Sequence, residues 1–114
     1  MKLITAIIKP SRLDAVLDAM KGAGVAGMTV TEVRGFGRQK GKTEIYRGAE
    51  YEVKLLPKVK LEIVAEKEKS ESIVDAIAAA ARTGKIGDGK IWTCDLDSIL
   101  RIRTGERDAQ AVGE

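Results

Sequence analysis

The sequence predicts an α+β fold in which a long loop joins the second and third strands of one sheet. Segments rich in β-branched residues alternate with segments of helical periodicity in the order strand, helix, strand, and this order then repeats. The chain has 114 residues, 44% hydrophobic and 32% charged, which suits one core and is too polar for a membrane-embedded protein. We therefore expect a single domain over residues 1–114.

The first half of the pattern consists of three segments. Residues 2–9 are rich in β-branched side chains and end at Pro10, which predicts a strand. From Ser11 onward apolar residues recur at helical spacing, with proline in the first turn and glycines ending the helix at 22–24. Residues 27–36, rich in Thr and Val, predict the second strand.

The second half repeats this order. Residues 58–65 alternate apolar and polar side chains, which indicates a strand with one buried face. A helix follows from about Ser70, with Ser72 as its expected N-cap. Residues 90–96 predict a further strand, and 99–103 a short last one. The order is that of the ferredoxin-like βαββαβ sandwich, in which two helices cover one face of a four-stranded sheet.

The composition excludes several catalytic classes. The chain has no histidine, which rules out Ser-His-Asp and Cys-His arrangements. Its one cysteine, Cys94, rules out an internal disulfide and a cysteine-built zinc site. The longest apolar run, residues 76–81, is too short to span a membrane, and the N-terminus lacks the cleavage pattern of a signal peptide. We expect a cytoplasmic protein.

The net charge of +3 is unevenly distributed along the chain. Residues 34–60 hold eight Lys and Arg against three Glu, and residues 82–103 hold five against three Asp. Both segments also contain most of the interior glycines. Glycine lets backbone amides approach a ligand, and Lys or Arg neutralises its negative charge. We therefore favour an anion-binding site over a merely solvated basic surface.

The predicted loop between the second and third strands covers residues 37–55. Its 19 residues exceed the roughly 12–15 beyond which connections without secondary structure are usually functional or disordered. It also contains Tyr46 and Tyr51, two of the four aromatic residues of the chain. Such tyrosines have no core to fill, so we expect them to serve in a contact or a modification.

A glycine-rich turn is predicted at about residues 82–90, where 84–90 read GKIGDGK. The letters fit a P-loop, but Ile91 stands where Ser or Thr is required and the order is helix, loop, strand. Two interpretations remain open. The amides can cradle a phosphate, or the glycines can serve a tight connection that needs positive φ angles.

Arg101 and Arg103 are two apart on the last predicted strand, which would place both side chains on the same side. An anion such as phosphate between the guanidiniums would relieve their repulsion, whereas separate solvation is the alternative. Residues 35–39, GFGRQ, begin like a dinucleotide fingerprint, but Lys40 replaces the third glycine and no helix follows.

An RNA-binding module is a further alternative because such modules share this topology. They stack bases on aromatic side chains of the sheet, and outside the long loop this chain offers only Phe36 and Trp92. We therefore expect no direct contact with nucleic acid.

The sequence resembles the PII signal-transduction proteins, which sense nitrogen status. The resemblance rests mainly on TVTEVRGFGRQKGKTEIYRGAEY at 29–51 and TGKIGDGKIW at 83–92. MKLITAIIKP, LPKVKLEIV and RIRTGE match as well, so the similarity spans residues 1–106. It implies a homotrimer that binds ATP or ADP in the clefts between subunits.

The resemblance also implies ligand-binding residues. In the family, 2-oxoglutarate binds beside the nucleotide through Mg²⁺, and Gln39 matches the side-chain ligand of that metal. Lys58 matches the residue that pairs with the distal carboxylate of the acid. The positions that match nucleotide-binding residues are Thr29, Gly37, Arg38, Val64, Gly87, Asp88, Gly89, Lys90, Arg101 and Arg103.

The long loop corresponds to the T-loop of the family, which docks onto target proteins. Tyr51 matches its nucleotidylated residue, which implies a nucleotidyltransferase as a partner, and Arg47 matches the residue that plugs ammonium channels. The implied partners are thus an ammonium transporter, with recruitment to the inner membrane face, and nitrogen-metabolism regulators or enzymes. Lys42 and Lys54 replace the usual His and Asp and make this loop more basic.

The resulting hypothesis is a non-catalytic trimeric protein that senses ATP, ADP and 2-oxoglutarate and acts through its T-loop. A slow phosphohydrolase is the alternative, although no general base is evident. Because helices cover only one face of the sheet, we expect Ile4, Ala6 and Ile8 to need cover from other subunits, with the sheets facing inward. The segment at 101–114 forms the C-terminus.

Overall fold

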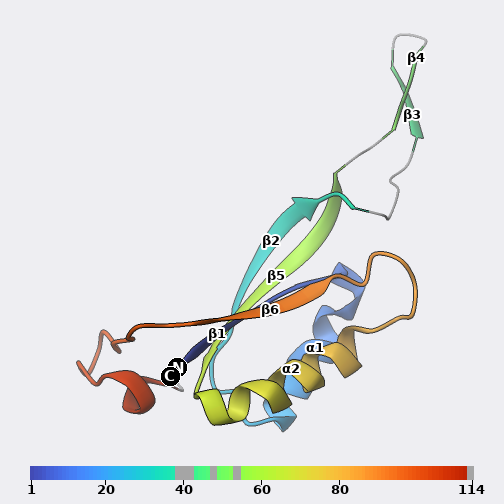
Figure 1. Cartoon of the computed structure of the whole chain (residues 1–114). Helices are drawn as coiled ribbons and strands as arrows, with labels where there is room; N and C mark the ends of the chain where they lie inside the picture. Colours follow the sequence, from blue (N-terminus) through green and yellow to red (C-terminus); the bar gives the residue numbers. More distant parts are fainter. Residues whose placement is uncertain (38–42, 47–48, 53–54, 113–114) are drawn as a thin grey trace.

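The computed structural model describes residues 1–37, 43–46, 49–52 and 55–112, with only the backbone described at 43–46 and 49–52. Four strands form an antiparallel sheet in the order β2-β5-β1-β6, and two helices cover one of its faces (Figure 1). The elements of this body are β1 (Lys2–Ile8), α1 (Leu13–Gly22), β2 (Thr29–Gly35), β5 (Leu56–Ala65), α2 (Lys67–Ala81) and β6 (Lys90–Asp95). The predicted ferredoxin-like fold is confirmed.

The core lies between the sheet and the two helices. Ile4, Ala6 and Ile8 of β1 are at most 1% exposed. They pack with the buried side chains of β5 and of the helices, namely Val59, Leu61, Ile63, Ala65, Val16, Met20, Ile73, Ile77 and Ala81. The prediction that these three β1 residues need cover from other subunits is therefore wrong, because the chain's own helices bury them.

The alternate residues of β1 lie on the opposite, bare face of the sheet. Leu3 and Ile7 are half-buried there, and Thr5 is paired with Trp92 of β6. Trp92 is 48% exposed. Thr5 itself is buried, so any subunit that packs against this face would cover Leu3, Ile7 and Trp92.

Helix α2 begins earlier than predicted. Its N-cap is Glu66 in extended conformation, without a side-chain capping bond, and Glu68 lies in the first turn. An acidic side chain there interacts favourably with the helix dipole. Ser72 lies inside the helix and donates its hydroxyl to the Lys69 carbonyl at 3.0 Å, so the predicted cap at Ser72 is wrong. A short 3-10 turn, η1 (Pro10–Arg12), precedes α1, as expected for a proline at the start.

The predicted last strand at 99–103 is also wrong. Only Leu100 forms an isolated bridge, with Arg107, and the chain folds back between these two residues. The Arg101 amide donates to the Glu106 carbonyl at 2.9 Å, and the Gly105 amide donates to the Arg101 carbonyl at 2.8 Å. Gly105 has a φ of +73°, which permits this tight turn. A 3-10 turn, η2 (Asp108–Ala111), follows.

The connection between β2 and β5 contains a ladder of its own. Strands β3 (Thr43–Tyr46) and β4 (Ala49–Glu52) pair antiparallel as a separate two-stranded sheet. Neither pairs with the four-stranded sheet. Within the described ranges, no helix has the length and apolar character needed to cross a membrane.

Candidate anion-binding site

The glycine-rich segment between α2 and β6 is a tight turn with unusual backbone angles. Gly84, Gly87 and Gly89 have φ angles of +82°, +100° and +98°, in the region that favours glycine. At Gly89 a Cβ atom would lie 1.7 Å from the carbonyl oxygen of Ile7. The turn therefore needs its glycines for backbone conformation, and Gly89 also for close contact with β1.

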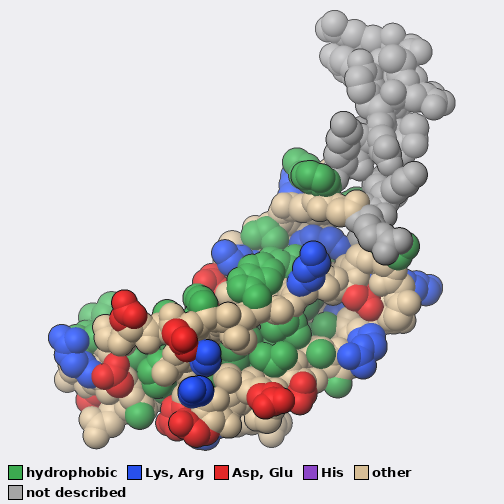
Figure 2. Space-filling model, in the orientation of Figure 1, with side chains coloured by type: hydrophobic (Ala, Val, Ile, Leu, Met, Phe, Trp, Pro, Cys, Tyr) green, Lys and Arg blue, Asp and Glu red, His purple; other side chains and the backbone are tan. Residues whose placement is uncertain are grey.

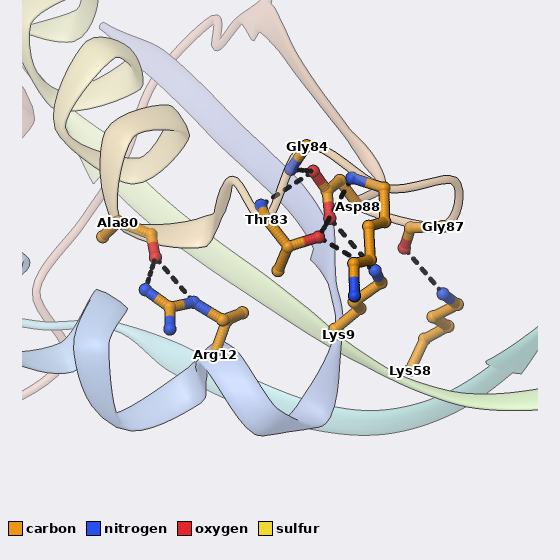
Figure 3. A network of polar contacts seen from close by, with 9 residues as sticks. Lys9, Arg12, Lys58, Ala80, Thr83, Gly84, Gly87 and Asp88 are labelled. Atoms are coloured by element: carbon orange, nitrogen blue, oxygen red, sulfur yellow. Dashed lines mark hydrogen bonds and ion pairs between the residues drawn. The ribbon is translucent and has the colours of Figure 1, made fainter.

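The Asp88 carboxylate closes this turn from the inside (Figure 3). One oxygen, Oδ2, accepts the amides of Thr83 and Gly84, both at 2.9 Å. The other, Oδ1, accepts the Thr83 hydroxyl and lies 3.2 Å from Nζ of Lys9. The Thr83 hydroxyl and these amides hold the pKa of Asp88 well below its usual range.

Further amides of the turn remain available to a ligand. Among the described residues, no acceptor bonds the amides of Ile86, Gly87 and Gly89, whereas those of Thr83, Gly84 and Lys85 are bonded to side chains. Consecutive amides of this kind form an anion-binding concavity. The two interpretations of the glycines are thus compatible, because the tight connection exposes the donors that a phosphate needs.

A cleft of about 580 Å³ lies beside the turn. Its lining includes the end of β2 at Gly35, Phe36 and Gly37, together with Lys58, Trp92 and the turn itself. Nζ of Lys58 donates to the Gly87 carbonyl at 2.8 Å. Burial, followed by the charge of Lys9, lowers the pKa of Lys58. Figure 2 shows Lys and Arg side chains gathered toward this end of the molecule, beside hydrophobic side chains.

The structure brings only part of the predicted nucleotide site together here. Gly37, Lys58 and residues 87–90 share this cleft. Thr29, Val64 and Arg101 line a second hollow of about 850 Å³. Lys90 is paired with Ile7 of β1, and Val64 is paired with Leu3 of the same strand. Ile7 and Leu3 are four residues apart, which corresponds to about 13 Å along the strand. The predicted residues therefore form two groups toward opposite ends of the sheet.

Arg101 is held by contacts within the C-terminal segment. Its Nη1 lies 2.7 Å from Oε1 of Glu106, and its Nη2 donates to the Val112 carbonyl at 3.4 Å. Arg103 follows in the turn and is exposed. Since this segment is no strand, the argument that Arg101 and Arg103 point to the same side is wrong.

Besides Gly37, four predicted functional residues belong to the connection between β2 and β5. Arg38, Gln39 and Arg47 lie outside the described residues. Tyr51 belongs to β4, where its backbone pairs with Glu44, and its side chain is outside the description. Of the two predicted 2-oxoglutarate residues, Lys58 alone can thus be placed. No group of three His, Cys, Asp or Glu within the described ranges could hold a metal ion.

The sequence-based prediction missed two residues that contact Asp88 at the turn. Lys9 comes from the end of β1, and its Nζ also donates to the Thr83 hydroxyl at 3.1 Å. Thr83 precedes the first glycine and stands five residues before Asp88. That spacing of a hydroxyl and a carboxylate around glycines is a typical turn signal, which could have identified Thr83. No local pattern indicates Lys9.

Comparisons with known proteins identify the family of this chain. The profile of the family described as nitrogen regulatory protein P-II matches residues 1–106. The chain is 58% identical to nitrogen regulatory protein P-II of Pasteurella multocida and 59% identical to nitrogen regulatory protein P-II 1 of Escherichia coli K12. Each alignment covers 98% of this chain and the whole of the relative. Identity over the full length of such relatives, together with the family match, shows that the chain belongs to the P-II family of nitrogen regulatory proteins.

Proposed function

We propose that this P-II protein is a non-catalytic sensor of ATP, ADP and 2-oxoglutarate that regulates nitrogen-metabolism targets through its T-loop. The observation that carries the proposal is the separation of the predicted nucleotide residues into two groups toward opposite ends of the sheet. Neither group surrounds a ligand alone. A site assembled from the turn of one subunit and the C-terminal end of the next would join them, which favours a homotrimer.

The glycine-rich turn has the chemistry of the phosphate half of such a site. The amides of Ile86, Gly87 and Gly89 have no acceptor among the described residues, and the side chains of Lys58 and Lys90 line the same cleft. Backbone donors and ammonium groups together bind phosphate well. The turn thus fits the phosphates of ATP or ADP.

The second hollow suits the other half of the proposed nucleotide site. Its lining includes the charged Arg101 and the apolar Val64 and Ile102. Ile102 is 95% exposed and Leu100 46% exposed in the single chain. Exposed apolar side chains beside a hollow favour cover by another subunit or by a ligand. Thr29 supplies a hydroxyl to the same hollow.

The proposed 2-oxoglutarate site adjoins the phosphate turn through Lys58. A carboxylate of the acid would accept from the same ammonium group that contacts the Gly87 carbonyl. Mg²⁺ prefers oxygen ligands, and Gln39 would help to hold one ion beside both ligands, where it would neutralise the negative charge of the phosphates and of the acid. This shared ion makes the binding of the acid depend on the nucleotide.

We assign the contact with target proteins to the T-loop. Its strands β3 and β4 pair with each other and with no strand of the body, so they can adopt arrangements that the core does not dictate. A ligand shifts such arrangements only by binding one of them better than another. We assign Tyr51 to modification by a nucleotidyltransferase and Arg47 to contact with an ammonium transporter, which would recruit this cytoplasmic protein to the membrane.

Calorimetry with ATP, Mg²⁺ and 2-oxoglutarate in all combinations tests the sensor, with light scattering for the oligomeric state. We expect a trimer that binds ATP alone and binds 2-oxoglutarate only when ATP and Mg²⁺ are both present. Steady-state phosphate release should stay at background, which distinguishes a sensor from a phosphohydrolase. A micromolar monomer, or tight binding of the acid to nucleotide-free protein, would contradict the proposal.

Deletion of residues 43–51 tests the output. The deletion removes Arg47 and Tyr51 and leaves the turn and both hollows in place. We therefore expect unchanged ATP affinity and no capture of an ammonium transporter from membranes. Equal capture by the intact and the deleted protein would show that partner contact lies elsewhere.

A further inference from the structure

We propose that Lys9 and Thr83, acting through the Asp88 carboxylate, are positioning residues that hold the 83–89 turn in its anion-binding form. The inference deepens the proposed nucleotide site and rests on it. It assigns a role to two residues that the sequence pattern did not single out. It also assigns the Asp88 side chain to the turn itself rather than to a ligand.

Both carboxylate oxygens of Asp88 are occupied inside the turn. Oδ2 accepts two amides, those of Thr83 and Gly84, each at 2.9 Å. Oδ1 accepts the Thr83 hydroxyl and contacts Lys9 at 3.2 Å. These bonds join the last part of the turn to its first two residues (Figure 3). The carboxylate therefore acts as a clasp between the two ends of the turn rather than as a ligand group.

Lys9 neutralises the negative charge that the Asp88 carboxylate brings into the turn. A carboxylate within a phosphate-binding turn would repel the phosphate unless a cation neutralises it. Nζ of Lys9 lies 3.2 Å from Oδ1 of Asp88 and 3.1 Å from the Thr83 hydroxyl oxygen. Its side chain is 16% exposed, so solvent screens the pair less than a surface pair. Because Lys9 directly follows β1, the same contact ties the turn to the sheet.

The turn needs such a clasp because its sequence is flexible. Three of its residues are glycines at positive φ, each of which loses much conformational freedom on folding. Gly89 is fixed by its close approach to the Ile7 carbonyl, which anchors one end of the turn. The bonds from Asp88 to Thr83 and Gly84 anchor the other end. With both ends held, the amides at 86–89 are ordered before a ligand arrives, which lowers the entropic cost of binding.

The test uses the full-length protein and two measurements. ATP affinity is measured by calorimetry, and amide hydrogen exchange of the turn is measured in the nucleotide-free protein. The variants are Thr83→Val, which removes the hydroxyl at nearly constant volume, Thr83→Ser, which retains it, and Lys9→Gln. Asp95→Asn is the matched control, since Asp95 forms the 2.7 Å ion pair with Lys2 at the far end of the sheet. Circular dichroism and thermal unfolding verify that each variant folds.

We expect Thr83→Val and Lys9→Gln to weaken ATP binding about tenfold and to speed exchange of the turn amides in the free protein. Thr83→Ser should restore both properties, and Asp95→Asn should change neither. Weaker ATP binding with unchanged exchange would mean that these side chains touch the nucleotide directly, which overturns the positioning role. Unchanged ATP affinity in both variants would overturn it as well.

The design separates this inference from the proposed function. If the unmodified protein binds no ATP, the proposed nucleotide site is wrong, and the exchange data then decide the clasp on their own. Faster exchange in Thr83→Val, restored in Thr83→Ser, would support the clasp. Equal exchange in all variants would overturn it.

Discussion

The two ends of the sheet present different kinds of hydrogen-bond donor to the proposed anion sites. At the end next to α2, the glycine-rich turn offers backbone amides, and a set of side-chain bonds around Asp88 holds it in shape. At the other end, the C-terminal segment offers the side chain of Arg101, which Glu106 and Val112 orient. An anion site built from backbone amides would thus depend on the conformation of glycines. One built from a single side chain would depend on the residues that hold that side chain in place.

The largest expected effect is that of Gly89→Ala at the backbone end. The new Cβ would meet the Ile7 carbonyl oxygen at 1.7 Å, in a residue whose φ is +98°. Backbone strain alone costs about 1–3 kcal/mol, and the clash adds to it by separating β6 from β1. Thermal unfolding should show a large fall in stability. Gly105→Ala is the control, since φ is +73° there but nothing lies within 4 Å. An equal fall in both variants would show that the contact with Ile7 is unimportant.

A smaller effect is expected for Arg101→Ala at the side-chain end. The change removes the charge-assisted bond to Glu106 and, in the proposed site, a phosphate contact, each worth about 1.5–3 kcal/mol when fully used. ATP affinity should fall at least tenfold, and amides of the C-terminal segment should exchange faster. Arg103→Ala should weaken ATP binding as well, because the proposed site places its guanidinium at the phosphates. Unchanged ATP affinity in both variants would contradict the phosphate assignment.

Lys58→Gln should separate the acid site from the phosphate turn. The change removes the ammonium group that donates to the Gly87 carbonyl. We expect 2-oxoglutarate binding to fall at least tenfold, because a charged partner is lost, and ATP binding to fall only a few-fold. Titration of each ligand by calorimetry measures both effects. Equal losses would show that Lys58 serves the turn more than the acid.

The smallest expected effect is a difference between Asp88 and Asp95 in how their carboxylates respond to acid. The pKa of Asp88 is lowered mainly by the Thr83 hydroxyl, and that of Asp95 mainly by its hydrogen bond with Lys2. A lowered folded pKa stabilises the fold above the unfolded value, about 3.9, and this contribution is lost as the pH falls through the folded pKa. The turn should therefore persist at pH 4, with Lys9, Gly84 and Thr83 still around Asp88.

High salt should affect the pKa of Asp95 more than that of Asp88. The Lys2–Asp95 pair is exposed on the Asp95 side, with 82% of that side chain accessible, so about 1 M salt should screen it. The pKa of Asp88 rests chiefly on short-range hydrogen bonds and should change little. Carboxyl carbon shifts in an NMR titration, with and without salt, follow both groups. An equal response to salt would mean that Lys9, rather than Thr83, dominates at Asp88.

Much of the fold could be predicted from local pattern. The alternation in 58–65 and the periodicity after Ser11 predicted β5 and α1, because the spacing of apolar residues reports which face must be buried. The glycines of the turn indicated positive φ, which three of them adopt. The same alternation misled at 99–103, where apolar and basic residues alternate as in a strand but the chain folds back at Gly105.

The sequence by itself determined the order of the strands and helices of the four-stranded body, the place of the glycine-rich turn and the family, but it did not indicate β3 and β4. It could not show that Ile4, Ala6 and Ile8 lie under the chain's own helices, since alternation does not say which face a helix will cover. Nor could it show the contact of Lys9 with Thr83, which are 74 residues apart. Only the antiparallel pairing of β1 with β6 brings these residues together. Local pattern reports what a residue must bury, whereas the partner of a charged side chain depends on which distant strand lies beside it.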